Sequence, residues 1–157
     1  MYTPPSPDAL FTLAWSACIP KFHTPSLAVV QTLLLLVQRR PTNKHVADTP
    51  FKWILMTNAV SISQALGLNL DPSDWPLPLW EQRLRKRLAW ALFTQDKWLS
   101  LNFGRSSHIC PDDWDVSALR PEDFEEHDQD GSPATSEYFL RLCVLSGVVD
   151  DILRNLL

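Results

Sequence analysis

Two patterns in the sequence predict an all-α fold, a multi-helix, bundle-like domain. Apolar residues recur at spacings of three and four along several segments, and no segment of useful length alternates as a strand does. In addition, a Ser/Thr-Pro pair stands before an apolar segment four times, where the hydroxyl can cap free amides and proline suits the first turn. These pairs are Ser6-Pro7, Thr24-Pro25, Thr49-Pro50 and Ser132-Pro133. With 157 residues, 45% of them apolar, the chain is expected to form a single helical domain over residues 1–157.

The first three helices are predicted in the N-terminal part of the chain. The first covers about Asp8–Cys18, because Pro20 prevents its continuation. The second covers about Pro25–Arg40, and a polar loop follows it. The third begins at Thr49, is apolar on more than one side, and ends at Gly67.

The longest helix is predicted after a proline-rich crossover, Leu68–Pro78. It begins at Pro78 or Leu79 and ends at Phe103, before Gly104. Its first half carries an apolar stripe opposite a cluster of bases, which is expected to be a solvated face and a candidate interaction face. The cluster consists of Arg83, Arg85, Lys86 and Arg87. A localisation signal and a phosphate-binding patch remain as alternatives, and some of these arginines could instead pair with a later acidic loop.

Asp96 lies in the second half of this helix, which is apolar almost all round. A carboxylate in such a place is costly unless it is paired or hydrogen-bonded. Arg105, just past Gly104, is the predicted partner, and exposure of Asp96 to solvent is the alternative. Asp96, Gly104 and Arg105 are therefore interpreted as structural groups.

The C-terminal third is predicted to be an acidic, mainly irregular loop over residues 106–132, followed by a helix over residues 133–157. Nine of the eighteen acids lie between Asp112 and Asp130. The apolar stripe of the helix is predicted to comprise Tyr138, Leu142, Leu145, Val149 and Leu153. Because this helix stops on two leucines with no polar cap, we expect the chain to be an incomplete piece of a larger domain.

The sequence contains no recognisable catalytic motif, so no enzyme activity and no cofactor are predicted. The densest set of metal-ligating residues has a spacing that does not force the ligands to converge, and no metal site is expected. This set is His108, Cys110, Asp112 and Asp113. A net charge of −4 argues against nucleic-acid binding by the chain itself, and three distant cysteines are expected to be reduced thiols.

Four segments over residues 25–116 carry a family resemblance by their order: PSLAVVQTLLLLVQRR, FKWILMTNAVSISQALGLNLDPSDW, LWEQRLRKRLAWALFTQDKWLSLNFGRSSHI and PDDWDV. They resemble the middle homology region of fungal-specific transcription factors, the binuclear zinc-cluster activators and repressors. In this comparison Gly67 matches an L-G-L-H-x-D element, and Trp90 follows the family's arginine-rich turn. Asp96 begins the D-R element, and Gly104-Arg105 begins G-R-P. The departures are Asn69 for His, Ala89 for Trp, Lys97 for Arg and Ser106 for Pro.

The resemblance implies a regulatory region that modulates RNA polymerase II transcription in the nucleus without contacting DNA. The resemblance implies that this region acts through intramolecular or homodimer contacts, through transcriptional co-regulators, or through a small effector. It implies no contact with a membrane. Zinc and DNA would be bound only by a six-cysteine segment that these residues lack. Two alternatives remain open: a helical scaffold or interaction domain unrelated to transcription, and, least favoured, a small metal-assisted hydrolase that uses His108 and Asp112.

Overall fold

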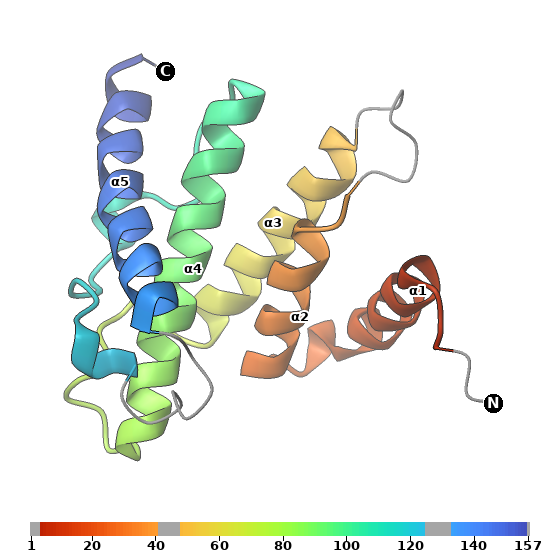
Figure 1. The fold of residues 1–157 in the computed structure, drawn as a ribbon, viewed down its shortest axis with the longest axis horizontal. Helices are drawn as coiled ribbons and strands as arrows, with labels where there is room; N and C mark the ends of the chain where they lie inside the picture. The colour runs from red at the N-terminus through yellow and green to blue at the C-terminus, as the bar shows by residue number, and fades with distance from the viewer. Residues whose placement is uncertain (1–3, 41–47, 125–132, 157) are drawn as a thin grey trace. The chain divides into compact units, whose positions relative to one another are not determined.

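The computed structural model describes residues 4–40, 48–124 and 133–156 and is all-α, as predicted (Figure 1). Within these residues the only extended pairing is a single parallel bridge between Leu70 and Asp115. The chain separates into two compact units, residues 1–66 and 67–157, and each is described by itself. That residues 1–157 act as one domain stays a prediction.

The first unit contains three α-helices: α1 (Pro7–Cys18), α2 (Leu27–Val37) and α3 (Thr49–Ala65), with a short 3-10 helix, Ile19–His23, after α1. The helix start predicted at Ser6 is confirmed, because its hydroxyl accepts a hydrogen bond from the amide of Ala9 at 3.2 Å. The start predicted at Pro25 was wrong by two residues. Ser26 is extended, with φ −151° and ψ 157°, so the helix begins only after it.

The core of the first unit lies mainly between α2 and α3, which pack against each other. Trp15 of α1 adds edge-on ring contacts with Phe22 and Phe51, at centroid distances of 6.4 and 5.7 Å. The largest fully buried side chains of α2 and α3 are apolar: Val30, Leu33, Val37, Leu55 and Met56. The amphipathic patterns thus place this core as expected.

The second unit is built on α4 (Leu79–Phe103) and α5 (Pro133–Leu156), which pack side by side (Figure 1). Two further 3-10 helices, Pro111–Asp113 and Pro121–Phe124, lie in the segment between them. The bounds predicted for α4 are confirmed, including the stop at Gly104, which has a left-handed φ of 59°. The cap predicted at Ser132 lies outside the described residues.

The crossover at residues 68–78 is irregular, as predicted, and it is ordered by the segment that follows α4. The amide of Asp115 donates to the carbonyl of Asn69 at 2.9 Å, and the Asn69 side chain donates to the carbonyl of Asp113 at 3.0 Å. The Asp71 carboxylate accepts from the amide of Ser117 at 2.8 Å. Burial raises the pKa of Asp71, but hydrogen bonds from Ser117 and Ser73 outweigh it and hold this pKa well below its usual range.

The stripe predicted for α5 was wrong in part. Val149 and Leu153 are buried, but Tyr138 is 68% and Leu145 48% exposed. The buried face instead includes two polar residues, Ser146 and Asp150, together with Cys143. These polar groups face α4 because they have partners there: Trp98 for Ser146 and Lys97 for Asp150.

Candidate functional site

The most deeply buried charged groups of the second unit are Asp96 and Lys97, adjacent residues of α4 that are both 0% exposed. Successive residues of an α-helix point about 100° apart, so the two side chains reach different surroundings. Since a buried charge without a partner is very costly, both must be compensated from within the fold.

Asp96 is compensated by the segment just after α4. Its carboxylate accepts from the amide of Ile109 at 3.0 Å, from the amide of His108 at 3.2 Å, and from the Ser107 hydroxyl. The His108 ring also contacts it, with 2.7 Å between Nδ1 and Oδ1. Burial raises the pKa of Asp96, but the hydrogen bonds from His108, Ser107 and Ile109 outweigh it and hold that pKa below its ordinary value.

The prediction that Asp96 is buried and partnered is therefore confirmed, but the predicted partner was wrong. Arg105 is exposed, and the contacts to the carboxylate come from the three residues Ser107–Ile109. Gly104 explains the difference, because its left-handed turn ends the helix and the Arg105 amide closes this turn on the Ser100 carbonyl at 3.0 Å. The chain then returns to Asp96 a few residues later.

Lys97 is compensated from both sides of α4. Its ammonium donates to the Ser107 hydroxyl at 2.6 Å and to the Ile109 carbonyl at 2.9 Å. It also forms an ion pair with Asp150 of α5 at 2.7 Å, and it lies 4.9 Å from the centre of the Phe93 ring. Lys97 thus connects both the segment after α4 and helix α5 to α4.

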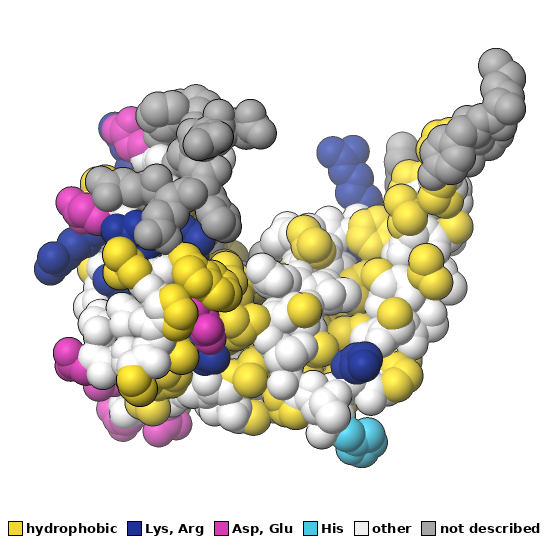
Figure 2. Space-filling model, turned by 90° about the horizontal axis from the view of Figure 1, so that it is seen from below, with side chains coloured by type: hydrophobic (Ala, Val, Ile, Leu, Met, Phe, Trp, Pro, Cys, Tyr) yellow, Lys and Arg dark blue, Asp and Glu magenta, His cyan; other side chains and the backbone are white. Residues whose placement is uncertain are grey.

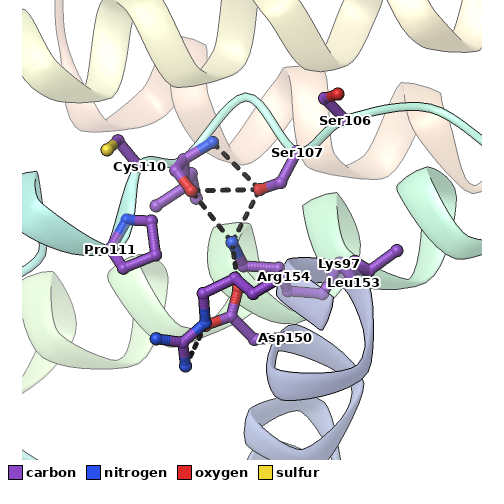
Figure 3. Close-up of a pocket in the computed structure, with 9 residues that line it drawn as sticks. Lys97, Ser106, Ser107, Cys110, Pro111, Asp150, Leu153 and Arg154 are labelled. Carbon is purple, nitrogen blue, oxygen red and sulfur yellow. Dashed lines mark hydrogen bonds and ion pairs between the residues drawn. The ribbon is translucent and has the colours of Figure 1, made fainter. Parts of the chain in front are cut away.

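A cavity of about 270 Å³ lies beside this network, between the segment after α4 and the C-terminal half of α5 (Figure 3). Arg154 pairs with the other carboxylate oxygen of Asp150, at 3.0 Å, and also pairs with Asp151. The charges at the cavity are therefore paired with one another.

The basic cluster of α4 is the second charged region, and the prediction that it forms a solvated face was wrong. Lys86 is only 8% exposed and pairs with Asp123 at 3.2 Å. The Arg87 guanidinium donates to the Asp123 carbonyl and lies 5.7 Å from the centre of the Phe124 ring. Lys86 thus pairs with the acidic segment, and Arg87 contacts the same segment through a backbone carbonyl and an aromatic ring.

The two other bases of the cluster are also engaged. Arg85 pairs with Glu81 one turn earlier at 2.9 Å, and its guanidinium lies 5.4 Å from the centre of the Trp75 ring. Arg83 is half-buried and lines a cavity of about 280 Å³. Lys86, Arg85 and Arg87 therefore hold packing contacts of the second unit, and the interaction face expected from the sequence stays a prediction.

Trp90 and Gly67, the remaining residues singled out from the sequence, lie in closely packed surroundings. The Trp90 indole donates to the Ser117 carbonyl at 2.9 Å, and its ring packs edge-on against Trp114 at 5.7 Å. Gly67 follows α3 with φ 69°, and a Cβ on it would lie 2.8 Å from the ring of Trp75. Only glycine fits there without strain.

The part of the chain that the structure describes contains no group of three or more His, Cys, Asp or Glu side chains that could hold a metal ion. It also contains no helix long and apolar enough to cross a membrane. Figure 2 shows hydrophobic side chains at the surface of each unit, with acidic and basic side chains among them.

A family described as "Fungal specific transcription factor domain" matches residues 3–157 of this chain. The chain belongs to this family. The resemblance noted over residues 25–116 is thereby confirmed, and the match covers both helical units. Asp96 and Lys97, which match the D-R element of that resemblance, are both 0% exposed in the second unit.

Relatives of this fungal-specific transcription factor domain are regulators of transcription by name. The chain is 36% identical over 146 residues to the transcriptional activator protein DAL81 of Saccharomyces cerevisiae, which covers 84% of the chain and 14% of that protein. It is 32% identical over 132 residues to cutinase transcription factor 1 alpha of Fusarium vanettenii, a match that covers 78% of the chain and 14% of that protein. It is 30% identical over 128 residues to the acetamidase regulatory protein of Aspergillus oryzae, a match that covers 81% of the chain and 16% of that protein.

The chain thus spans about a seventh of the length of these curated relatives. No solved structure matches it. The six-cysteine zinc cluster that the family resemblance implies does not fit these residues, because the chain has three cysteines and two of them, Cys18 and Cys143, are buried.

Proposed function

We propose that this chain is the regulatory, non-DNA-contacting region of a fungal zinc-cluster transcription factor and that it modulates RNA polymerase II transcription in the nucleus. The observation that carries the proposal is the family match over residues 3–157, together with relatives named as transcriptional activators and regulators. In this function the chain is not an enzyme and needs no cofactor of its own. Zinc and DNA are bound by a zinc-cluster segment elsewhere in the full-length factor.

The charges of the second unit support a role that does not depend on phosphate contacts. Non-specific affinity for nucleic acid comes from lysines and arginines that reach phosphates. Here Lys86 and Arg87 are engaged with Asp123 and Phe124, and the net charge of the chain is −4. The domain therefore works through protein contacts, within the factor, between two copies or with co-regulators, or through a small effector.

A reporter assay tests this function. The chain is fused to a bacterial DNA-binding module and expressed in a fungal cell that carries the matching operator before a reporter gene. We expect the fusion to change reporter output, in either direction, relative to the module alone. The matched control is Leu92→Asp, which places a charge in the core at a side chain 1% exposed and should return output to that of the module alone. A folded wild-type fusion whose output equals that of the module would contradict the proposal.

A further inference from the structure

An acidic segment of the second unit is held on its two long helices by a charged and an aromatic contact. We call residues 120–124 the strap, and its last four residues form the 3-10 helix Pro121–Phe124. Its Asp123 carboxylate pairs with Lys86 of α4 at 3.2 Å, and both side chains are largely buried, at 14% and 10% exposed. Its Phe124 ring packs edge-on against Phe139 of α5, at a centroid distance of 6.3 Å.

The receiving surface consists of Lys86, Arg87 and Phe139, and we call it the seat. The Arg87 guanidinium lies 5.7 Å from the centre of the Phe124 ring and also donates to the Asp123 carbonyl. The ring is therefore in contact with a cation from α4 and an aromatic edge from α5. The seat thus recognises two neighbouring features: a carboxylate and an aromatic ring.

The seat cannot simply be left empty, because Lys86 would then be a largely buried ammonium without a counter-charge. A segment that displaces the strap must supply a carboxylate in place of Asp123. A phosphate would satisfy Lys86 but not the aromatic part of the seat, where Arg87 and Phe139 contact a ring. The two requirements together select a peptide.

A cavity of about 280 Å³ lies beside the strap. Its lining includes Arg83 and Lys86 of α4, which favour an acidic ligand, and Arg120, Glu122 and Asp123 of the strap itself, which leave the cavity when the strap is displaced. The strap is itself a short 3-10 helix, a form with poorer hydrogen-bond geometry than an α-helix. Its hold on the unit therefore depends on the Asp123 and Phe124 contacts, which a similar segment could replace one for one.

We propose that the seat is a docking site for an acidic peptide segment in which a carboxylate stands beside an aromatic ring, and that the strap occupies this site within the chain. The strap acts as a competing ligand, so binding in trans requires its displacement. This inference rests on the proposed regulatory function, because it names the kind of protein segment through which such a domain makes contacts.

Fluorescence anisotropy with a labelled synthetic peptide tests the proposal. The peptide copies residues 118–126, ALRPEDFEE, and the control peptide ALRPENAEE removes the carboxylate and the ring. Three forms of the full chain are compared: wild type, the double variant Asp123→Asn with Phe124→Ala, and this double variant with Lys86→Met added. Far-UV circular dichroism confirms that each form is folded.

The double variant should bind the peptide at least about tenfold more tightly than wild type, because a tethered strap competes at an effective concentration on the order of millimolar. Adding Lys86→Met should weaken binding at least about tenfold, and the control peptide should bind as weakly. Equal affinity for wild type and double variant, or binding that does not depend on Lys86 or on the Asp-Phe pair, would overturn the proposal.

If the double variant does not fold, Phe124→Ala alone keeps Asp123 on Lys86 and loosens only the aromatic half of the strap. It should then bind the peptide more tightly than wild type, and unchanged affinity would overturn the proposal. Failure of the docking site and of the proposed function are distinguishable. Absent peptide binding with an active reporter fusion contradicts the docking site alone, and peptide binding with a silent fusion contradicts the transcriptional function alone.

Discussion

Lys97 and Asp150 form an ion pair of 2.7 Å between α4 and α5, with 0% and 8% of their side chains exposed. Such a pair is not a large net source of stability, because its attraction is offset by the cost of removing both charges from water. Loss of one member is different, since the other is left buried and uncompensated. The pair therefore makes the contact between the two helices sensitive to single substitutions.

Substitution of Lys97 by Met should lower the free energy of unfolding by about 3–5 kcal/mol, because it leaves Asp150 without its buried cation. Urea denaturation followed by circular dichroism measures the change.

Arg154→Met is the matched control for Lys97→Met, because Arg154 contacts the same carboxylate of Asp150 from a side chain that is 51% exposed. Its loss should cost no more than about 1 kcal/mol. Equal losses for the two variants would show that Lys97 is not the group that compensates Asp150.

The low pKa of Asp96 predicts a loss of stability in acid. The folded-state pKa of Asp96 lies below the unfolded value of about 3.9. Its contribution to the free energy of unfolding is therefore complete above the unfolded pKa and declines as pH falls through the folded pKa. Stability should therefore fall steadily below about pH 4. Asp96→Asn should be less stable at pH 7 and should show a shallower acid decline, because the titrating group is gone.

Urea midpoints measured between neutral and acidic pH test the Asp96 prediction. Asp71, whose pKa is also lowered, gives the comparison: Asp71→Asn should remove a separate share of the acid decline. An acid decline as steep in Asp96→Asn as in wild type would mean that the buried carboxylate does not contribute to it.

Gly67→Ala should destabilise the chain more than Gly104→Ala does. Both glycines have positive φ, so both substitutions incur the left-handed penalty of about 1–2 kcal/mol. At Gly67 the new Cβ would also lie 2.8 Å from the Trp75 ring, whereas at Gly104 nothing lies within 4 Å. Thermal unfolding of the two variants measures the difference, and equal shifts in Tm would show that the Trp75 ring yields without cost.

The sequence predicted the helices well where one local pattern decides their limits. The bounds of α4 followed from its apolar pattern and from Gly104, and both are local properties. The burial of Asp96 was predictable for the same reason, because its neighbours along the helix are apolar. Its partners were not, since the position of Ser107–Ile109 depends on the path of the chain after the helix.

Charged and polar residues account for the main errors. The local pattern predicts a solvated Lys86, because its counter-charge, Asp123, is distant in sequence. Ser146 and Asp150 were left out of the buried face of α5 because a periodicity argument treats polar residues as outward-facing. The Ser146 hydroxyl in fact accepts from the indole of Trp98 at 3.0 Å, and Asp150 pairs with Lys97. Partners on α4 therefore set which face of α5 is buried.

The observed face of α5 makes a last prediction in which one substitution is made at two leucines. Leu153→Ala should lower the free energy of unfolding by about 2–5 kcal/mol, because this side chain is buried. Leu145→Ala should change it by no more than about 0.5 kcal/mol, because Leu145 is 48% exposed. The helix propensity change is the same at both sites, so the difference in urea midpoints reports burial. Similar losses at the two positions would support the apolar stripe predicted from the sequence, in which both leucines face the core.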